Sequence, residues 1–467
     1  MEIREKIVDL MALHNSPMTH HMTRNLQLLL YLSLACEAAA ANWPQFRGPQ
    51  ASGVDSSAPA PIHWDIDKGQ NVLWRAPIPG LAHSSPILWG DRVYVATAVA
   101  PGKAKLKVGL YGDIEPAGNE GPQQWRLLAL DKATGKVAWN TLGHEGPPRS
   151  QRHPKASHCN VTPATDGRRI VTIFGSEGLF CVDMAGKLMW HKDLGPMDSG
   201  YYQVPSAQWG FASSPVLHED KVVVVCDVQK DSFIAVYALL DGKQLWRTPR
   251  TDVPSWATPT IVAVGTQKEV LVNGWHHIGA YDFATGKEIW NLDGGGDIPV
   301  PTPVVAYGLA YFTSAHGQFR PMRAIRLEAQ GNITPADPGQ TNAAIVWAHA
   351  RRGNYMQTPI VVGENLYACV DNGVLTCFDA KSGAVRYSER LGNGSEGFTS
   401  SPVSDGRHLF FASETGHVYV VPADGKFSIA ATNTLNETCM ASPALSGGTL
   451  YYRTRDQVVA IGGLEAR

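Results

Sequence analysis

The segment ALDKATGKVAW (residues 129–139) contains the pattern on which the fold depends. An apolar run ends at Asp131, the turn ATGK follows, and the next run carries Trp139. AYDFATGKEIW (residues 280–290) has the same order of residues. A short apolar run, a turn that contains glycine and a second run with a large aromatic predict a β-hairpin.

A second signal repeats along the whole chain: a small residue followed by proline. The shortest spacings run from 41 residues, between Pro402 and Pro443, to 44 residues, between Pro215 and Pro259. Such a period suits four short strands and their turns. The eight occurrences are Ser85-Pro86, Thr162-Pro163, Ser214-Pro215, Thr258-Pro259, Thr302-Pro303, Thr358-Pro359, Ser401-Pro402 and Ser442-Pro443.

Each unit continues with an apolar strand, a turn, a third strand and a fourth strand that carries an aromatic residue. The aromatics are Trp139, Trp190, Trp246, Trp290, Trp347 and Tyr387. Because proline cannot donate to a β-ladder, we place the Ser/Thr-Pro strand at the inner edge of each sheet and the Trp strand outermost. The sequence therefore predicts an all-β protein, an eight-bladed β-propeller with four-stranded blades.

The last unit indicates how the ring closes. It contains TLYYRT (449–454) and VVAIGG (458–463), and the chain then ends without a fourth strand. NVLWRAPI (71–78) resembles a fourth strand, yet it precedes the first Ser-Pro and has no unit of its own. Pairing the two fragments completes blade eight and leaves no open edge at the seam. We expect Trp74 to be essential for this closure.

The order Pro, strand, L-x-A-L-D, x-T-G-K, W resembles the PQQ-type repeats of quinoprotein dehydrogenases and of the outer-membrane assembly lipoprotein. The opening WPQFRGP (43–49) is similar to the start of secreted bacterial proteins in this superfamily. The resemblance covers residues 43–463 and implies one propeller domain over residues 42–467. The resemblance to quinoprotein dehydrogenases implies an oxidoreductase with PQQ and calcium. The resemblance to the assembly lipoprotein implies a protein that binds other proteins.

The cofactor features of the dehydrogenase branch are missing from the sequence. It contains no vicinal cysteine pair, no C-x-x-C-H haem motif and no recognisable Glu/Asn/Asp calcium set. We therefore expect a binding or scaffold protein without a cofactor rather than an enzyme. A PQQ-type dehydrogenase with PQQ and calcium is the alternative. A hydrolase that uses His153 or His277 is a third reading, but no nucleophile motif accompanies it.

The first 41 residues are interpreted as upstream sequence and a signal peptide. A basic start at residues 22–24 precedes an apolar run at residues 26–35 and small residues at 37–41. This places the mature protein in the periplasm or outside the cell, with residues 1–21 ahead of the true start. An amphipathic helix is one alternative. Lipid attachment at Cys36 is another, and only then is membrane association expected.

Charge and cysteine content exclude several classes. Lys plus Arg number 40 and Asp plus Glu number 42, so no net charge attracts nucleic acid. The six cysteines after residue 41 form no C-x-x-C pair. Cys369 and Cys377 flank a turn and could pair across a hairpin, but buried free thiols are favoured.

We expect the protein to be a monomer.

The long connections predict which face functions. Turns between strands two and three share a face, here called the top, with the blade-to-blade links. Most of the expansions lie there, at 99–124, 143–158 and 195–210 among others, whereas the bottom face has one expansion, at 328–342. Loops on a rigid scaffold commonly carry binding residues. Loops that merely pack over one another are the alternative.

Aromatic and cationic side chains are concentrated in these top-face loops. Such side chains often anchor interfaces, so we expect the top face to bind a protein, a glycan or a small ligand. The segment 149–158 could bind an anion or be a solvated basic loop. The candidate binding residues are Arg149, Arg152, His153, His158, Tyr202, Trp209, Trp256, His277, His316, Arg352 and Tyr355.

Overall fold

The computed structural model describes residues 42–109, 114–316 and 319–463. Residue contacts divide the chain into Met1–Ala40 and Ala41–Arg467. The predicted signal peptide and Cys36 therefore lie outside the described residues. Within the described part, the helical element is the 3-10 turn η1 (Pro49–Ala51), and no helix is long or apolar enough to span a membrane.

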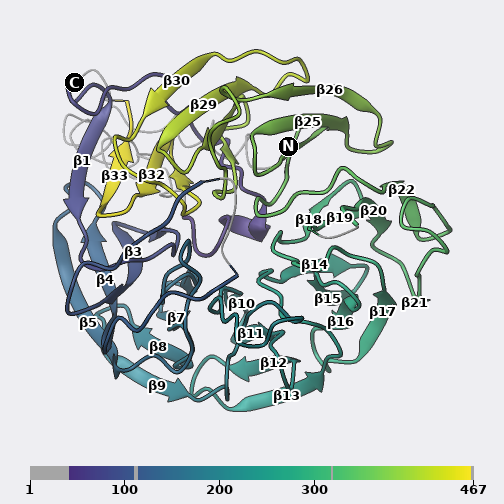
Figure 1. The fold of residues 1–467 in the computed structure, drawn as a ribbon, viewed down its shortest axis with the longest axis horizontal. Coiled ribbons are helices and arrows are strands. Elements are labelled where there is room, and N and C mark those ends of the chain that lie inside the picture. Colours follow the sequence, from purple (N-terminus) through teal and green to yellow (C-terminus); the bar gives the residue numbers. More distant parts are fainter. Residues whose placement is uncertain (1–41, 110–113, 317–318, 464–467) are drawn as a thin grey trace, which may run out of the picture. The chain divides into compact units, whose positions relative to one another are not determined.

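Eight sheets follow one another around a ring (Figure 1). From the channel outward, the strands of blades 1 to 4 are β2 (Ile87–Trp89), β3 (Arg92–Val99), β4 (Gln123–Asp131), β5 (Val137–Gly146); β6 (Ala164–Thr165), β7 (Arg169–Ile173), β8 (Leu179–Asp183), β9 (Leu188–Lys192); β10 (Val216–His218), β11 (Lys221–Cys226), β12 (Phe233–Ala238), β13 (Gln244–Pro249); and β14 (Thr260–Val264), β15 (Gln267–Val272), β16 (Ile278–Asp282), β17 (Glu288–Leu292). Those of blades 5 to 8 are β18 (Val304–Ala306), β19 (Leu309–Thr313), β20 (Met322–Arg326), β22 (Ile345–His349); β23 (Ile360–Val362), β24 (Asn365–Cys369), β25 (Val374–Asp379), β26 (Val385–Arg390); β27 (Val403–Ser404), β28 (His408–Ala412), β29 (His417–Pro422), β30 (Ala431–Thr434); and β31 (Ala444–Ser446), β32 (Thr449–Arg453), β33 (Gln457–Ile461), β1 (Val72–Pro77).

The predicted closure is confirmed. Strand β1 pairs antiparallel with β33, with Trp74 opposite Ala460 and Arg75 opposite Val459. In Figure 1 the purple β1 lies beside the yellow β33. The ring is thus an eight-bladed propeller whose last blade takes its outer strand from the beginning of the domain.

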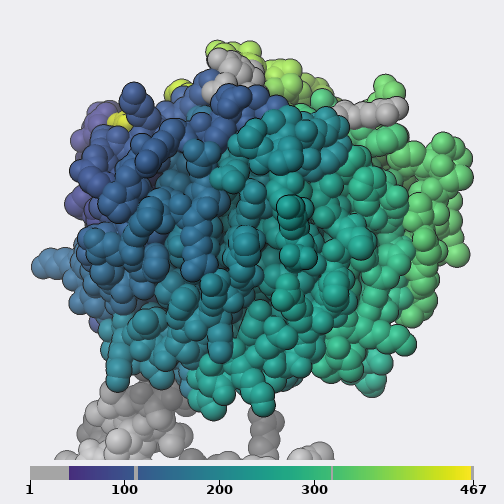
Figure 2. Space-filling view, turned by 60° about the horizontal axis from the view of Figure 1, so that its bottom comes forward, coloured from purple at the N-terminus to yellow at the C-terminus, as the bar shows by residue number. Residues whose placement is uncertain are grey.

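The hydrophobic core lies between neighbouring blades rather than at one centre. In one cluster, for example, Val223 and Ile234 of blade 3 pack with Val270 and Tyr281 of blade 4. The outer wall is correspondingly closed, and blue, teal and green blades follow in chain order (Figure 2). All six described cysteines are free and buried in these cores. Burial raises their thiol pKa values, so these cysteines remain protonated.

The outer tryptophans fasten each blade to the next one. Trp74 of blade 8 donates its indole N–H to the carbonyl of Lys132 in blade 1 at 2.8 Å, and its ring lies on Gly135. Gly135 has φ +70°, and a Cβ there would stand 2.5 Å from the Trp74 ring. The glycine of the TGK turn is therefore required by both backbone conformation and space. Trp139, Trp190, Trp246 and Trp347 donate equivalent bonds of 3.0 Å.

Trp290 is the exception, and blade 5 explains it. The expansion at residues 328–342 replaces the short turn on which a tryptophan would rest. Part of it, β21 (Gly331–Asn332), adds a parallel fifth strand beyond β17 in blade 4. Trp290 is buried, but its indole N–H has no partner among the described residues. It packs edge-on against Phe312 instead.

The repeated Ser/Thr before each proline forms a second connection, near the channel. Its backbone N–H donates to the hydroxyl of the same residue in the next blade, at 2.9–3.0 Å, in six of the eight steps. The steps from blade 4 to 5 and from blade 8 to 1 lack this bond, although their residues are described. A hydroxyl at this position thus supplies an acceptor that alanine could not.

The segment that opens with WPQFRGP crosses the bottom of the channel. The carbonyl of Pro44 accepts from the Thr165 N–H of blade 2, and Val54 forms a bridge with Ser404 of blade 7. Arg47 lies buried between them and donates to four backbone carbonyls, including those of Pro359 and Pro402. Burial lowers its pKa to about 9. The segment closes the channel from below.

Blade 4 has an acidic residue at a position where blade 1 has a basic one, and this difference predicts a pH-dependent stability. Arg92 lies opposite Asp131 in blade 1 and bonds to it at 3.2 Å, whereas Glu269 takes that place opposite Asp282 in blade 4. Glu269 is 2% exposed and one of its oxygens has no described partner. Burial, assisted by Asp282 and Glu328, raises its pKa to about 7. The folded state therefore holds an extra proton between the unfolded pKa near 4.5 and pH 7, so stability falls as pH rises through this window.

Replacing Glu269 with glutamine is expected to remove this loss. The thermal midpoint of Glu269→Gln should match that of the wild type at pH 5 and exceed it at pH 8.5, because the amide cannot ionise. Glu145→Gln, a change at an exposed position of β5, is the control and should show no such difference. Equal midpoints of Glu269→Gln and wild type at pH 8.5 would contradict the assignment.

Candidate functional site

A cavity of about 600 Å³ occupies the upper part of the channel. Phe46, from the segment across the bottom, lies at its base, and top-face loops surround its mouth. Its volume lies in the range that holds small ligands in other proteins. Seven of the eight repeated hydroxyl residues line its wall: Ser85, Thr162, Ser214, Thr258, Thr358, Ser401 and Ser442.

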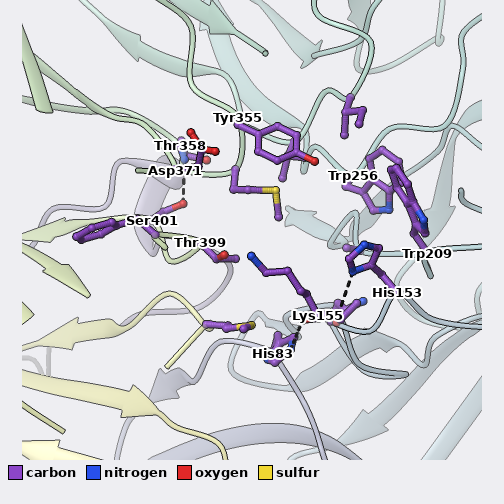
Figure 3. A pocket seen from close by; sticks show the side chains of 18 of the residues that line it. His83, His153, Lys155, Trp209, Trp256, Tyr355, Thr358, Asp371, Thr399 and Ser401 are labelled. Atoms are coloured by element: carbon purple, nitrogen blue, oxygen red, sulfur yellow. Dashed lines mark hydrogen bonds between the residues drawn. The ribbon is translucent and has the colours of Figure 1, made fainter. Parts of the chain in front are cut away.

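Stacked aromatic rings form one wall of the cavity. The ring of Trp209 lies parallel to that of Tyr201 at 5.7 Å, and its other neighbour is Trp256 at 5.9 Å. Tyr201 in turn contacts His316 at 6.0 Å, and His316 stacks on Tyr355 at 5.9 Å. Figure 3 shows Trp209 and Trp256 side by side, with Tyr355 on another side of the cavity. Burial raises the pKa of Tyr355 to about 12, so its hydroxyl stays neutral.

The aromatic contacts continue beyond the cavity. Tyr202 meets Tyr201 at 5.2 Å and Trp275 at 4.8 Å, and Trp275 stacks on the exposed His276 at 3.9 Å. These rings come from different loops that converge only in the folded ring. The top face therefore carries a connected set of aromatic rings that leads from the channel to the rim.

A buried ion pair also lines the cavity. The Lys155 ammonium lies 2.8 Å from Glu414, which is 1% exposed and also accepts from the Thr399 hydroxyl at 2.6 Å. The second oxygen of Glu414 accepts from the Gly109 N–H at 2.9 Å. This carboxylate therefore joins the long loop of blade 1 to blade 7 and neutralises the lysine. His83, which bonds to the Lys155 carbonyl, has its pKa lowered to about 4 by burial.

Five predicted site residues line this cavity: His153, Trp209, Trp256, His316 and Tyr355. His153 packs edge-on against Trp209 at 5.4 Å. His316 faces Asp297 at 2.9 Å, so it is oriented by a carboxylate. The structure thus brings together residues from the links after blades 1, 2, 3 and 5 and from one turn of blade 5.

The other six candidates lie outside the cavity. Arg149 pairs with Asp193 at 2.9 Å on the surface, Tyr202 packs on Trp275, and Arg352 is exposed at the rim.

Arg152 is 1% exposed and binds Glu120 through two bonds of 2.6 and 2.7 Å. His158 lies 3.6 Å from the same Glu120. In this structure Arg152 therefore holds the loop of blade 1 in place, rather than facing the channel.

His277 belongs to a buried polar network beneath the loops of blades 3 and 4. Its ring bonds to Glu288, and its carbonyl accepts from Arg250 at 2.6 Å. Arg250 also forms a two-bond pair with Asp227, at 2.7 and 3.0 Å, and both side chains are fully buried. Asp252 beside them accepts backbone N–H groups of the loop that carries Trp275 and His276. The network sets the position of the outer aromatic rings.

Several lining residues were absent from the sequence-based candidates. Tyr201, Lys155, Asp371, Thr399 and Glu414 all face the cavity. Tyr201 and Lys155 adjoin or lie within segments that the sequence singled out, but their orientation could not be read from it. Glu414 lies in a minimal turn of blade 7, SETGH (413–417), which carried no signal of length or composition.

The donor set does not fit the calcium of a quinone site. Both oxygens of Glu414 are bonded, and Asp297 is held by His316. Across residues 42–463, apart from the undescribed 110–113 and 317–318, no group of three or more His, Cys, Asp or Glu is arranged to hold a metal ion. A calcium ion needs six to eight oxygen ligands.

Comparison with known proteins places the chain among PQQ-repeat propellers. Tetrathionate hydrolase of Acidithiobacillus ferrooxidans is 27% identical over 212 residues, which are 44% of this chain but 32% of that protein. The outer membrane protein assembly factor BamB of Yersinia pestis is 20% identical over 316 residues, 56% of this chain and 74% of that protein. The chain thus spans about a third of the length of the first relative.

Solved structures share the fold at low identity. BamB from Moraxella catarrhalis has a TM-score of 0.52 and 15% identity, with 79% of this chain and all of that chain covered. Quinohemoprotein alcohol dehydrogenase from Comamonas testosteroni has a TM-score of 0.59 and 12% identity, with coverage of 94% and 83%. A europium-containing methanol dehydrogenase has a TM-score of 0.58 and 12% identity, with 89% of this chain and 90% of that chain covered.

A family model, that of the outer membrane protein assembly factor BamB, matches residues 54–236 and 230–462, nearly the whole propeller. The predicted resemblance to PQQ-repeat proteins is thereby confirmed. This chain belongs to the BamB-like family of PQQ-repeat eight-bladed propellers.

Proposed function

We propose that this protein is a binding propeller that works outside the cytoplasm and presents its top face to a partner or ligand. The observation that carries the proposal is the cavity, which has Phe46 at its base and connected aromatic rings at its mouth. Tyrosine and tryptophan provide large contact areas at little entropic cost, as binding surfaces require. No catalytic step is assigned to it.

The test compares two faces of the same ring. Wild-type protein, a Trp209→Ala/Tyr355→Ala variant and an Arg168→Ala/Arg407→Ala variant, changed in exposed bottom-face turns, are used to capture partners from a periplasmic extract. We expect the top-face variant alone to lose what the wild type retains. If all three proteins capture the same partners equally well, the cavity is not part of the contact surface.

The location outside the cytoplasm is supported by the apolar run at residues 26–35 and the small residues after it. N-terminal sequencing and intact mass of protein from its native host test it. A mature chain that begins near Asn42 is expected. A diacylated Cys36 would make the protein membrane-anchored, and an intact N-terminus would contradict export.

The alternative is a quinoprotein-like oxidoreductase, which the structural similarity to quinohemoprotein alcohol dehydrogenase favours. Adding PQQ and Ca²⁺ separates the two functions. We expect no bound quinone absorbance, because both oxygens of Glu414 are already bonded and Asp371, the other lining carboxylate, cannot by itself supply the oxygen ligands of a calcium ion. Bound quinone together with alcohol- or sugar-dependent dye reduction would replace the binding proposal.

A further inference from the structure

Three arginines lie together at the rim of blade 5. Arg320 and Arg351 are partners in a parallel β-bridge, and Arg352 follows directly. All three are exposed, and none forms an ion pair with a described residue. Arg320 also lines the cavity. Three exposed arginines on neighbouring backbone positions, none of them neutralised by an ion pair with a described residue, attract an anion.

The cavity next to them contains little positive charge of its own. Lys155 is neutralised by Glu414, and burial keeps His83 uncharged at neutral pH. One lining carboxylate, that of Asp371, has no ion-pair partner among the described residues. The arginine cluster therefore provides the main attraction for a negative group, and it lies at the mouth rather than the base.

Much of the cavity lining is apolar. Ile298, Val300, Phe398, Met356 and Met440 face the space, in addition to the aromatic wall. Methionine side chains are flexible and adapt to apolar shapes. Six of the seven lining Ser/Thr hydroxyls already accept a backbone N–H of the preceding blade, so they leave few free acceptors for the hydroxyl groups of a sugar. An apolar body suits these walls better.

From this arrangement we infer that the cavity binds a small amphiphilic anion. Its apolar body packs between the methionines and the aromatic rings, and its carboxylate, sulfonate or phosphate group meets Arg320, Arg351 and Arg352. Guanidinium groups bind such anions through paired, charge-assisted hydrogen bonds. The inference rests on the proposed function and names the ligand class for the same cavity.

Two fluorescent probes test the two halves of this inference. 8-Anilino-1-naphthalenesulfonate has an apolar body and an anionic group, and N-phenyl-1-naphthylamine has the same body without the charge. Binding constants are measured by fluorescence titration at low ionic strength. The wild type is expected to bind the sulfonate more tightly than the amine, and salt should weaken only the sulfonate, since exposed charges are screened.

Variants then locate the contacts. Arg320→Gln/Arg351→Gln/Arg352→Gln should weaken sulfonate binding by roughly tenfold or more and leave the amine unchanged. Arg168→Gln/Arg407→Gln, on the bottom face, is the matched control and should change neither. Met356→Trp, which fills the cavity, should weaken both probes, and Met440→Trp repeats this test from another position if the first variant is misfolded by circular dichroism.

The outcomes separate the two proposals. If both probes bind equally and the arginine variant changes nothing, the anion preference is wrong while the cavity remains a binding site. If neither the cavity-filling variants nor the arginine variant affects either probe, the cavity is not a binding site. The ligand class and the proposed cavity contact would then both be withdrawn.

Discussion

Trp74→Ala should lower the free energy of unfolding by about 3–5 kcal/mol, the usual cost of truncating a large buried aromatic side chain. Trp74 is 8% exposed, packs in a tilted arrangement against Tyr451 with 5.9 Å between the ring centroids, and donates its indole N–H to the Lys132 carbonyl of the next blade. Its loss leaves a void at the seam where the two ends of the ring meet. The weakened step joins blade 8 to blade 1, which also lacks the Ser/Thr bond near the channel.

Chemical denaturation with two independent probes measures this effect. Leu73→Ala on the same strand is the matched control, because Leu73 is 37% exposed and its truncation should cost much less. If β1 closes the ring, the whole propeller of Trp74→Ala should unfold in one transition, with its midpoint at a lower denaturant concentration than that of the wild type. An unchanged midpoint would mean that the seam does not limit stability.

Asp227→Asn is the second change with a large expected effect. It removes the charge that faces the Arg250 guanidinium inside the protein, and breaking a buried pair from one side costs about 3–5 kcal/mol. Arg250 has its pKa raised, because the attraction of Asp227 outweighs burial. The remaining hydrogen bonds of Arg250, to Tyr281 and the His277 carbonyl, are to neutral groups, and the other nearby carboxylate, that of Asp252, lies 3.8 Å away.

Asp220→Asn is the control for this change. Asp220 forms a 2.7 Å pair with Lys221, but its side chain is 83% exposed, and such surface pairs contribute about 0–1 kcal/mol. Thermal and denaturant unfolding of both variants should differ accordingly. Asp227→Asn/Arg250→Met should recover part of the loss, since the buried guanidinium is removed together with its main partner, and Asp252 keeps its bonds from backbone N–H groups. A loss in the double variant larger than in Asp227→Asn alone would argue against this account.

The architecture could be predicted because it depends on local, repeated residue choices. Eight Ser/Thr-Pro sites, the TGK turns and the outer tryptophans each require one conformation, and the unmatched strand around Trp74 implied closure. The reasons for two of these choices required the structure. Ser/Thr provides a hydroxyl to the preceding blade, and glycine leaves room for the tryptophan of that blade. Both are contacts between units, which no single unit reveals.

The positions of the loop side chains could be predicted only in part. The lengths of the loops in the sequence indicated that most of the expansions lie on the top face. Five residues selected from these loops do line the cavity: His153, Trp209, Trp256, His316 and Tyr355. Arg152 came from the same basic segment as His153 and lies buried against Glu120. Adjacent residues in an irregular loop point in unrelated directions, and no periodicity predicts which one faces the channel.

The amino-acid sequence by itself therefore determined the number of blades, the order of their strands and the place where the ring closes, because these follow from short-range turn and strand chemistry repeated eight times. Only the tertiary structure decided which side chains meet at the channel: Lys155 with Glu414, the stack around Trp209, and the unpaired arginines of blade 5. Lys155 and Glu414 are 259 positions apart, and the other two groups come from separate loops. The physical cause that brings them together is the arrangement of the blades around one channel, on which their loops converge.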